Sequence, residues 1–278
     1  MTSMKTTSPI RSAFAGVLLA GSALLLPMLP ASAQIIFQEN FDYPAGTTGT
    51  LSIDNYGWLA WTNAGVNVTA NTAITNGGKN YWAGVEDGYL KGFGSGDTTN
   101  ARYHMVYKEL GAGLTIANGT EITWTMGNNA TYAQLRLLVQ VGGTAGDVTS
   151  GQWFVSSGDW FQSTTLFAAN NDAGFAAADP VALTKSFTFT TDKNSWRTLT
   201  IDPTQTDESW LTLGSTSTTN LPSNTITSIG FLTGISNAAS VFRLDSLTVG
   251  TAIPEPTVSA LLLAAVGCAA FVFVRRRK

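Results

Sequence analysis

Side chains with hard oxygen atoms occur near both ends of the central part of the chain. The stretch QENFD contains Glu39, Asn40 and Asp42, and the stretch FRLDSL contains Asp245. Carboxylate and amide oxygens are the ligands that calcium prefers. If the first and last strands of a β-sandwich lie side by side, these four residues predict a structural Ca²⁺ site. In the alternative interpretation, Asp42 caps a turn and Asp245 is solvated.

Aromatic residues suggest a second kind of chemistry, because a flat ring face can stack on a pyranose ring. The chain has eight Trp and seven Tyr, and large aromatic side chains are also the usual occupants of a protein core. Trp124 and Trp153 lie in strand-like stretches and are predicted core residues. The candidates for carbohydrate stacking lie in or beside loop-like stretches: Trp58, Trp61, Trp82 and Trp160.

Catalytic motifs are missing from the sequence. Its single histidine, His104, lies in the strand-like stretch ARYHMVYKEL, and no G-x-S-x-G motif accompanies it. One histidine excludes two-histidine metal sites, and the single cysteine, Cys268, lies near the C-terminus. Glycoside hydrolysis needs only two carboxylates, so a hydrolase with an unrecognised carboxylate pair stays open. The sequence therefore favours a non-catalytic protein.

The elements that must position these residues are strands. TEITWTM and AQLRLLVQV alternate apolar and polar residues, which indicates strands with one buried face. Similar short runs recur between Gly-, Asn- and Asp-rich turns, and residues 170–185 form the longest break, predicted to be a loop with one helical turn. The pattern predicts one all-β domain over residues 34–250, an antiparallel β-sandwich or jelly roll.

The last of these strands has an irregular pattern. In VFRLDSLTV the apolar positions change face at Asp245 and Ser246. One extra residue inserted into a strand has this effect, so we expect a β-bulge there.

The first 33 residues have the three parts of a secretory signal peptide. Lys5 and Arg11 are positive, an apolar stretch follows, and the small residues at Ala31 and Ala33 suit signal peptidase. We expect cleavage after Ala33 and export across the inner membrane.

The C-terminal segment predicts a single membrane-spanning helix. Residues 257–274 are uncharged and long enough to span the hydrocarbon core of a bilayer. The positive residues Arg275, Arg276, Arg277 and Lys278 follow directly, and such clusters stay on the cytoplasmic side. The basic cluster therefore acts as a stop-transfer signal, with the rest of the exported chain outside.

Residues 251–278 resemble the PEP-CTERM sorting signal of exported proteins in Gram-negative bacteria. The resemblance rests on Pro254, Glu255 and Pro256, followed by the apolar segment and the arginine-rich end; Ile253 stands where valine is commoner. It implies recognition by an exosortase, which processes such proteins near the tripeptide. The protein would be anchored transiently in the inner membrane and then reach the cell surface or the extracellular matrix.

The charge of residues between these two terminal signals limits the partners. Nine Lys and Arg stand against 17 Asp and Glu there, a net charge of about −8. Such a surface repels nucleic acid and anionic lipid. We therefore expect a surface protein that binds or organises extracellular polysaccharide, and a structural adhesion or coat protein is a further alternative. The central region resembles jelly-roll carbohydrate-binding modules loosely, and the predicted calcium site is similar to theirs.

Overall fold

The computed structural model describes residues 34–42, 53–63, 82–86, 89–93, 103–168, 171–205, 208–234 and 241–250. They belong to one compact unit, Gln34–Ala252. The predicted signal peptide and sorting signal, including the motif at 254–256 and the basic tail at 275–278, lie outside the described residues. Within those residues, no helix has both the length and the apolar character needed to cross a membrane.

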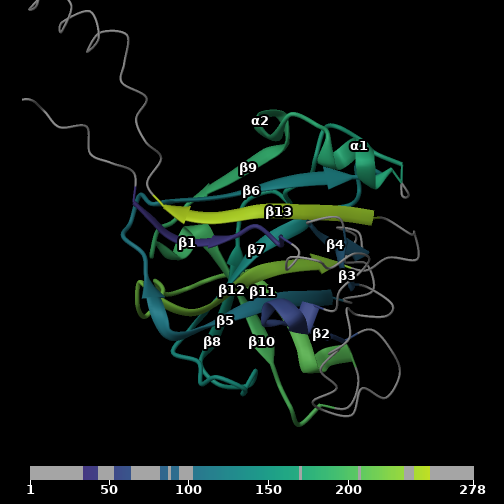
Figure 1. Cartoon of the computed structure of the whole chain (residues 1–278). Coiled ribbons are helices and arrows are strands. Elements are labelled where there is room, and N and C mark those ends of the chain that lie inside the picture. The colour runs from purple at the N-terminus through teal and green to yellow at the C-terminus, as the bar shows by residue number, and fades with distance from the viewer. Residues whose placement is uncertain are drawn as a thin grey trace, which may run out of the picture. The chain divides into compact units, whose positions relative to one another are not determined.

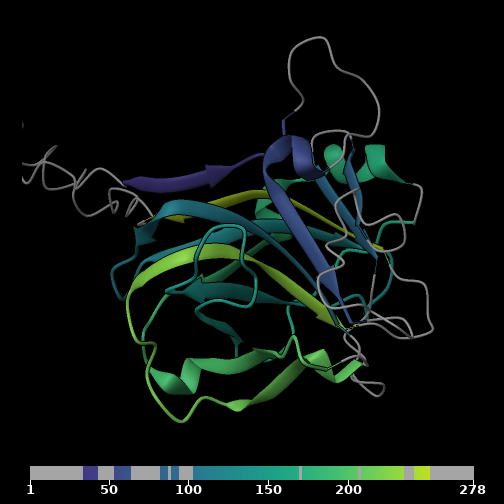
Figure 2. The same ribbon diagram turned by 90° about the horizontal axis from the view of Figure 1, so that it is seen from below.

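The described strands form two antiparallel sheets that pack as layers (Figure 1). The six-stranded sheet runs β3 (Trp82–Glu86), β4 (Tyr89–Phe93), β13 (Val241–Gly250), β6 (Glu121–Asn128) and β9 (Thr184–Thr188), with β1 (Ile35–Glu39) also paired to β13. The seven-stranded sheet runs β11 (Leu211–Thr216), β10 (Trp196–Ile201), β8 (Gln152–Ser156), β7 (Leu135–Val141), β12 (Thr225–Gly234), β5 (Tyr103–Thr115) and β2 (Trp58–Thr62). In Figure 2, the green strands β10 and β11 lie at the opposite side of the view from the purple strand β1. The prediction of an all-β antiparallel sandwich is confirmed.

Helical turns among the described residues are short. Besides the 3-10 turns η1 (Ile53–Tyr56), η2 (Lys193–Ser195) and η3 (Glu208–Trp210), the structure has α1 (Asp172–Ala176) and α2 (Pro180–Leu183). The stretch expected to be a loop with one helical turn thus holds two helices and the start of β9. Each helix has a polar N-cap: the side chain of Asn171 accepts a hydrogen bond from the Gly174 amide, and that of Asp179 from the Val181 amide.

The main core lies between the two sheets, where period-two strands turn one face inward. Trp124 of β6 is one of its buried residues, and its ring centroid lies 4.8 Å from that of Phe161 and 5.4 Å from that of Phe231. The prediction that Trp124 belongs to the core is confirmed.

The other face of the seven-stranded sheet is also buried, although the alternation predicted a face toward water. Every residue of β7 is buried, including Arg136 and Gln140 on this face. A second apolar cluster covers it, because η3 and β11 bring Trp210 against Trp61 of β2, with ring centroids 5.9 Å apart. We call it the outer cluster; its buried members are Trp61, Tyr103, Met105, Tyr107, Leu138, Val148, Trp153, Val155, Leu199, Trp210, Leu211 and Leu232.

The strand pairing at the chain's two ends follows the sequence pattern. β1 pairs antiparallel with β13, so the first and last described strands are neighbours. The register between β13 and β6 shifts between Asp245 and Thr248, and Ser246 has a φ of 54°. The predicted bulge is confirmed, and it explains why the apolar residues of β13 change face there.

Candidate functional site

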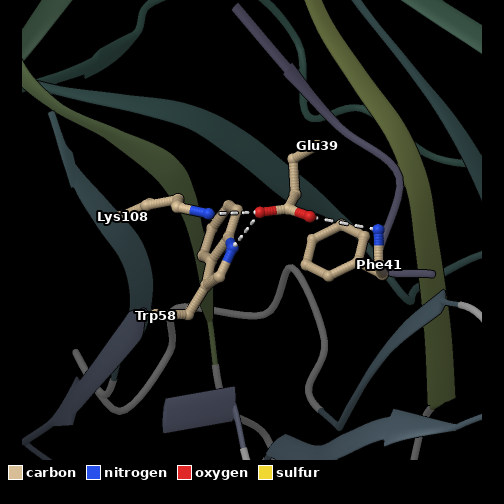
Figure 3. A network of polar contacts seen from close by, with 4 residues as sticks. All are labelled: Glu39, Phe41, Trp58 and Lys108. Atoms are coloured by element: carbon tan, nitrogen blue, oxygen red, sulfur yellow. Dashed lines mark hydrogen bonds and ion pairs between the residues drawn. The ribbon is translucent and has the colours of Figure 1, made fainter. Parts of the chain in front are cut away.

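The carboxylate of Glu39, at the end of β1, is held by three donors (Figure 3). The Lys108 Nζ lies 2.5 Å from Oε2, the Trp58 Nε1 donates to the same oxygen over 3.2 Å, and the Phe41 amide donates to Oε1 over 3.1 Å. Glu39 therefore joins β1 to β5 through a partly shielded ion pair and to β2 through a hydrogen bond.

Two backbone positions beside this carboxylate have unusual conformations. Phe41 and Ser246 are the non-glycine residues with positive φ in the described part of the chain, at 53° and 54°. A bulky residue rarely adopts this conformation unless its surroundings enforce it. Phe41 is enforced by its bond to Glu39 and by packing on Trp58, with ring centroids 5.3 Å apart.

Asp245 lies in the bulge and has a perturbed acidity. Burial raises the pKa of its carboxyl to about 6; the charges of Asp42 and Glu39 add to the rise, whereas hydrogen bonds from Ser246 oppose it. The carboxylates predicted as calcium ligands are thus close enough to influence each other. The side-chain oxygen of Asn40, the fourth predicted ligand, accepts a hydrogen bond from the Gln38 side chain over 2.8 Å.

The described residues contain no group of three or more His, Cys, Asp and Glu side chains arranged to hold a metal ion. The ammonium of Lys108 already neutralises Glu39, so of the predicted carboxylate ligands Asp42 and Asp245 lack a cationic partner in the described structure. The calcium site stays a prediction.

Two of the four tryptophans proposed to stack on sugar are buried, and the prediction is corrected for them. Trp58 is 0% exposed and Trp61 is 8% exposed, and both lie within β2 rather than in loops. Trp58 faces the main core and Trp61 the outer cluster, because both faces of this strand are covered. Trp82 begins β3, and its side chain lies outside the described residues.

Trp160 differs from the other candidates because its side chain is partly exposed. The guanidinium carbon of Arg136 lies 4.5 Å from the centroid of its ring, a cation–π contact. The ring borders a pocket of about 290 Å³, which we call the Trp160 pocket. Its lining residues are Ser156, Gly158, Asp159, Trp160, Phe161 and Phe187.

Arg136, on β7, positions the loop that contains Trp160. Its guanidinium donates to the carbonyls of Ser156 and Gly158, each over 2.5 Å. Burial lowers the pKa of Arg136 to about 10, with a further contribution from the charge of Arg197, whereas Asp159 opposes the shift. Arg136 remains charged at neutral pH, so the loop and the cation–π contact are maintained together.

Sequence reasoning did not single out Arg136. In AQLRLLVQV it lies on the face that was predicted to meet water, where a charged side chain needs no special partner. A signal was nevertheless present, since apolar residues stand on both sides of it and a buried arginine needs local acceptors.

The single histidine of the chain lies inside the fold. His104 is fully buried within β5, and burial holds its pKa well below the usual value of 6.5. The sequence also has two pairs of adjacent acidic residues, Glu86 with Asp87 and Asp207 with Glu208, of which Asp87 and Asp207 lie outside the described residues.

Comparison with known proteins gives only distant similarities. No model of a known protein family matches the chain, and no curated protein matches its sequence. A solved structure of the family 11 carbohydrate-binding module from Clostridium thermocellum, in complex with a β-1,3-1,4-mixed-linked tetrasaccharide, is 13% identical, with a TM-score of 0.36 over 79% of this chain and 99% of that one.

Two further solved structures are similarly remote. The solution structure of CtCBM11 is 15% identical, with a TM-score of 0.33 over 80% of this chain and 98% of that one. The K2 cleaved adhesin domain of Lys-gingipain is 15% identical, with a TM-score of 0.29 over 77% of this chain and 96% of that one. These values assign no family.

Proposed function

We propose that the protein is a non-catalytic binder of neutral extracellular polysaccharide, with the Trp160 pocket as a contact site. The observation that supports this most directly is the partly exposed ring of Trp160 beside a largely apolar pocket. A ring held in place by Arg136 loses little conformational freedom when a sugar packs against it. Ligand sites in proteins are usually such concave, mostly apolar places with few polar groups.

The polar groups at the pocket favour a neutral ligand. Asp159 lies on the rim and is exposed, so it can accept hydrogen bonds from sugar hydroxyls. The net charge of about −8 between the terminal signals disfavours acidic polysaccharides.

Affinity electrophoresis tests the proposal. The purified protein, residues 34–250, is run through gels that contain soluble neutral polysaccharides: mixed-linkage β-glucan, xylan, galactomannan and pullulan. We expect at least one to retard the protein and Trp160→Ala to abolish the retardation, whereas Trp160→Phe retains part of it. Tyr132→Ala is the matched control, because Tyr132 is an exposed aromatic residue outside the pocket.

Thermal melting of each variant separates lost binding from lost folding. If none of the neutral polysaccharides retards the folded wild type, the binding proposal is wrong. Release of reducing sugar from a retained polysaccharide by the purified protein would instead favour the hydrolase alternative. Binding to isolated surface proteins without any glycan retention would favour the adhesion alternative.

We also propose that this binder, a jelly-roll domain, is exported with a signal peptide and sorted by an exosortase. The support is the sequence at Pro254, Glu255 and Pro256, because two prolines keep the backbone extended and accessible before the apolar helix. Deleting the exosortase in the native host should raise the mass of the mature protein, as should replacing the tripeptide by three alanines. An unchanged mature mass in both cases excludes this processing.

A further inference from the structure

A groove of about 300 Å³ lies at the other end of β8 from the Trp160 pocket. β8 and β10 form its floor, and the segments before β8 and after β11 form its walls. We call it the threonine groove, because threonines from three of these segments line it. They are Thr149, Thr198, Thr200, Thr218 and Thr219.

The lining of the threonine groove has no ionisable side chain. Its polar groups are hydroxyls and the amide of Gln152, and its apolar surface comes from residues such as Phe154 and Ile201. Hydroxyls and amides both donate and accept hydrogen bonds, so they suit a ligand whose own groups do the same. A phosphate or carboxylate would find no cation here, and a metal ion would find no carboxylate.

Hydrogen bonds fix both walls. Before β8, the Thr144 amide donates to Ser150 Oγ over 2.7 Å, and Thr149 Oγ1 donates to Asp147 over 2.6 Å. After β11, the Ser217 amide donates to the Trp196 carbonyl over 2.8 Å, and Ser217 Oγ donates to the carbonyl of Thr219 over 2.6 Å. The groove is therefore already formed, and a ligand need not order it.

Several lining side chains have hydrogen-bonding capacity to spare. Within the described structure, the hydroxyls of Thr198, Thr200 and Thr218 and the amide of Gln152 make no hydrogen bond to another protein group. A bound sugar can exchange their water for its own hydroxyls without breaking a protein hydrogen bond.

The groove and the Trp160 pocket lie on the same side of β8. Alternate residues of a strand share a face, so Gln152 and Phe154, which line the groove, point to the same side as Ser156, which lines the pocket. Four residue steps separate Gln152 from Ser156, about 13 Å at the rise of a strand. An extended glycan of a few rings can bridge this distance.

We propose that the threonine groove is a second glycan subsite, which binds an uncharged, hydroxyl-rich unit of the polysaccharide chain that also contacts Trp160. This inference rests on the proposed binding of neutral polysaccharide. It adds a site whose recognition works through hydroxyls rather than through an aromatic ring.

The test uses residues 34–250 and the neutral polysaccharide that retards the wild type most. The double variant Thr198→Val with Thr200→Val removes two hydroxyls at nearly constant volume, and Thr200→Arg fills the groove. We expect the double variant to bind about tenfold more weakly, the scale of two neutral hydrogen bonds. Thr200→Arg should bind more weakly still. Thr164→Val is the matched control, because Thr164 is exposed and outside both sites.

The outcomes separate this inference from the function on which it rests. Full affinity in both groove variants, with affinity lost in Trp160→Ala, overturns the groove and leaves the Trp160 pocket intact. No retardation of the wild type by any neutral polysaccharide overturns both. Melting curves that match the wild type confirm that a weakened variant is folded, and the double valine variant remains informative if Thr200→Arg does not fold.

Discussion

The side-chain amide of Asn63 donates a hydrogen bond to the backbone carbonyl of Leu211 over 2.8 Å, although Asn63 directly follows β2 and Leu211 begins β11, the two edge strands of the seven-stranded sheet. The same amide donates to the Glu208 carbonyl over 2.6 Å, and its oxygen accepts from the Tyr103 amide over 2.6 Å. Asn63 is completely buried. It thus links β2 and β5 to β11, and the outer cluster is enclosed between them.

Replacing Asn63 by alanine should weaken this closure. Asn63→Ala leaves one buried amide and two carbonyls without these partners, so we expect a loss of about 2–4 kcal/mol in the free energy of unfolding. Urea unfolding measures it, and the fluorescence of Trp61 and Trp210 should shift to the red. Asn224→Ala, at an exposed position, should change stability little. Equal stability of the two variants would show that Asn63 does not hold the edges together.

The ion pair between Glu39 and Lys108 should stabilise the junction of β1 with the other sheet. Glu39→Gln leaves a partly shielded ammonium without its counter-charge, and we expect a loss of about 1–2 kcal/mol in urea unfolding. The double variant Glu39→Gln with Lys108→Met should recover part of that loss. Lys193→Met, at an exposed position, is the control for removing a lysine. Additive effects of the two changes would exclude coupling between them.

Asp245 should make the protein less stable as the pH rises. Its folded pKa of about 6 exceeds the ordinary 3.8, so the folded state binds more protons between these values. Stability is therefore lost as the pH rises from about 4 through 6, and it stays lower above that. Asp245→Asn should melt at a higher temperature than the wild type at pH 7.5, with the difference vanishing near pH 3.5.

An Asp with the opposite shift serves as the control for that experiment. Hydrogen bonds from Thr204 lower the pKa of Asp202, so Asp202→Asn should show no stabilisation at pH 7.5. A wild type that melts above Asp245→Asn at neutral pH, in the presence of a chelator, would contradict the raised pKa.

His104 should act in the other direction. The unfolded chain protonates this residue below pH 6.5, whereas the buried imidazole stays neutral, so the unfolded state binds more protons. Stability from this group is present above pH 6.5 and is lost as the pH falls. Between pH 7.5 and pH 5, the free energy of unfolding should therefore fall less in His104→Gln than in the wild type. The same slope in both proteins would mean that His104 takes up a proton while folded.

The calcium prediction has its own measurement. If calcium binds at Asp42 and Asp245, millimolar Ca²⁺ raises the melting temperature and EDTA reverses the rise. Asp245→Asn should then abolish the effect of calcium, while it still stabilises the protein in EDTA. A melting temperature unmoved by either reagent, with no calcium found by elemental analysis, would show that the calcium prediction is wrong.

Much of the sandwich could be predicted from local pattern. The alternation in β6 and β7 indicates strands because a strand's side chains point to opposite faces in turn, whatever the rest of the chain does. The phase change at Asp245 and Ser246 is equally local, and it falls within the register shift observed between Asp245 and Thr248. Trp153, expected in the core, is buried, although in the outer cluster rather than between the sheets.

The sequence alone determined the strand character of these segments and, through the pairing of chain ends expected in a sandwich, the meeting of β1 with β13. Only the tertiary structure decided which side of a strand is covered. Trp58 and Trp61 are buried, and Trp160 is partly exposed, because covering depends on segments far away in the chain, such as η3 over β2. Local periodicity records that a strand has two faces; the folded chain determines what packs on each of them.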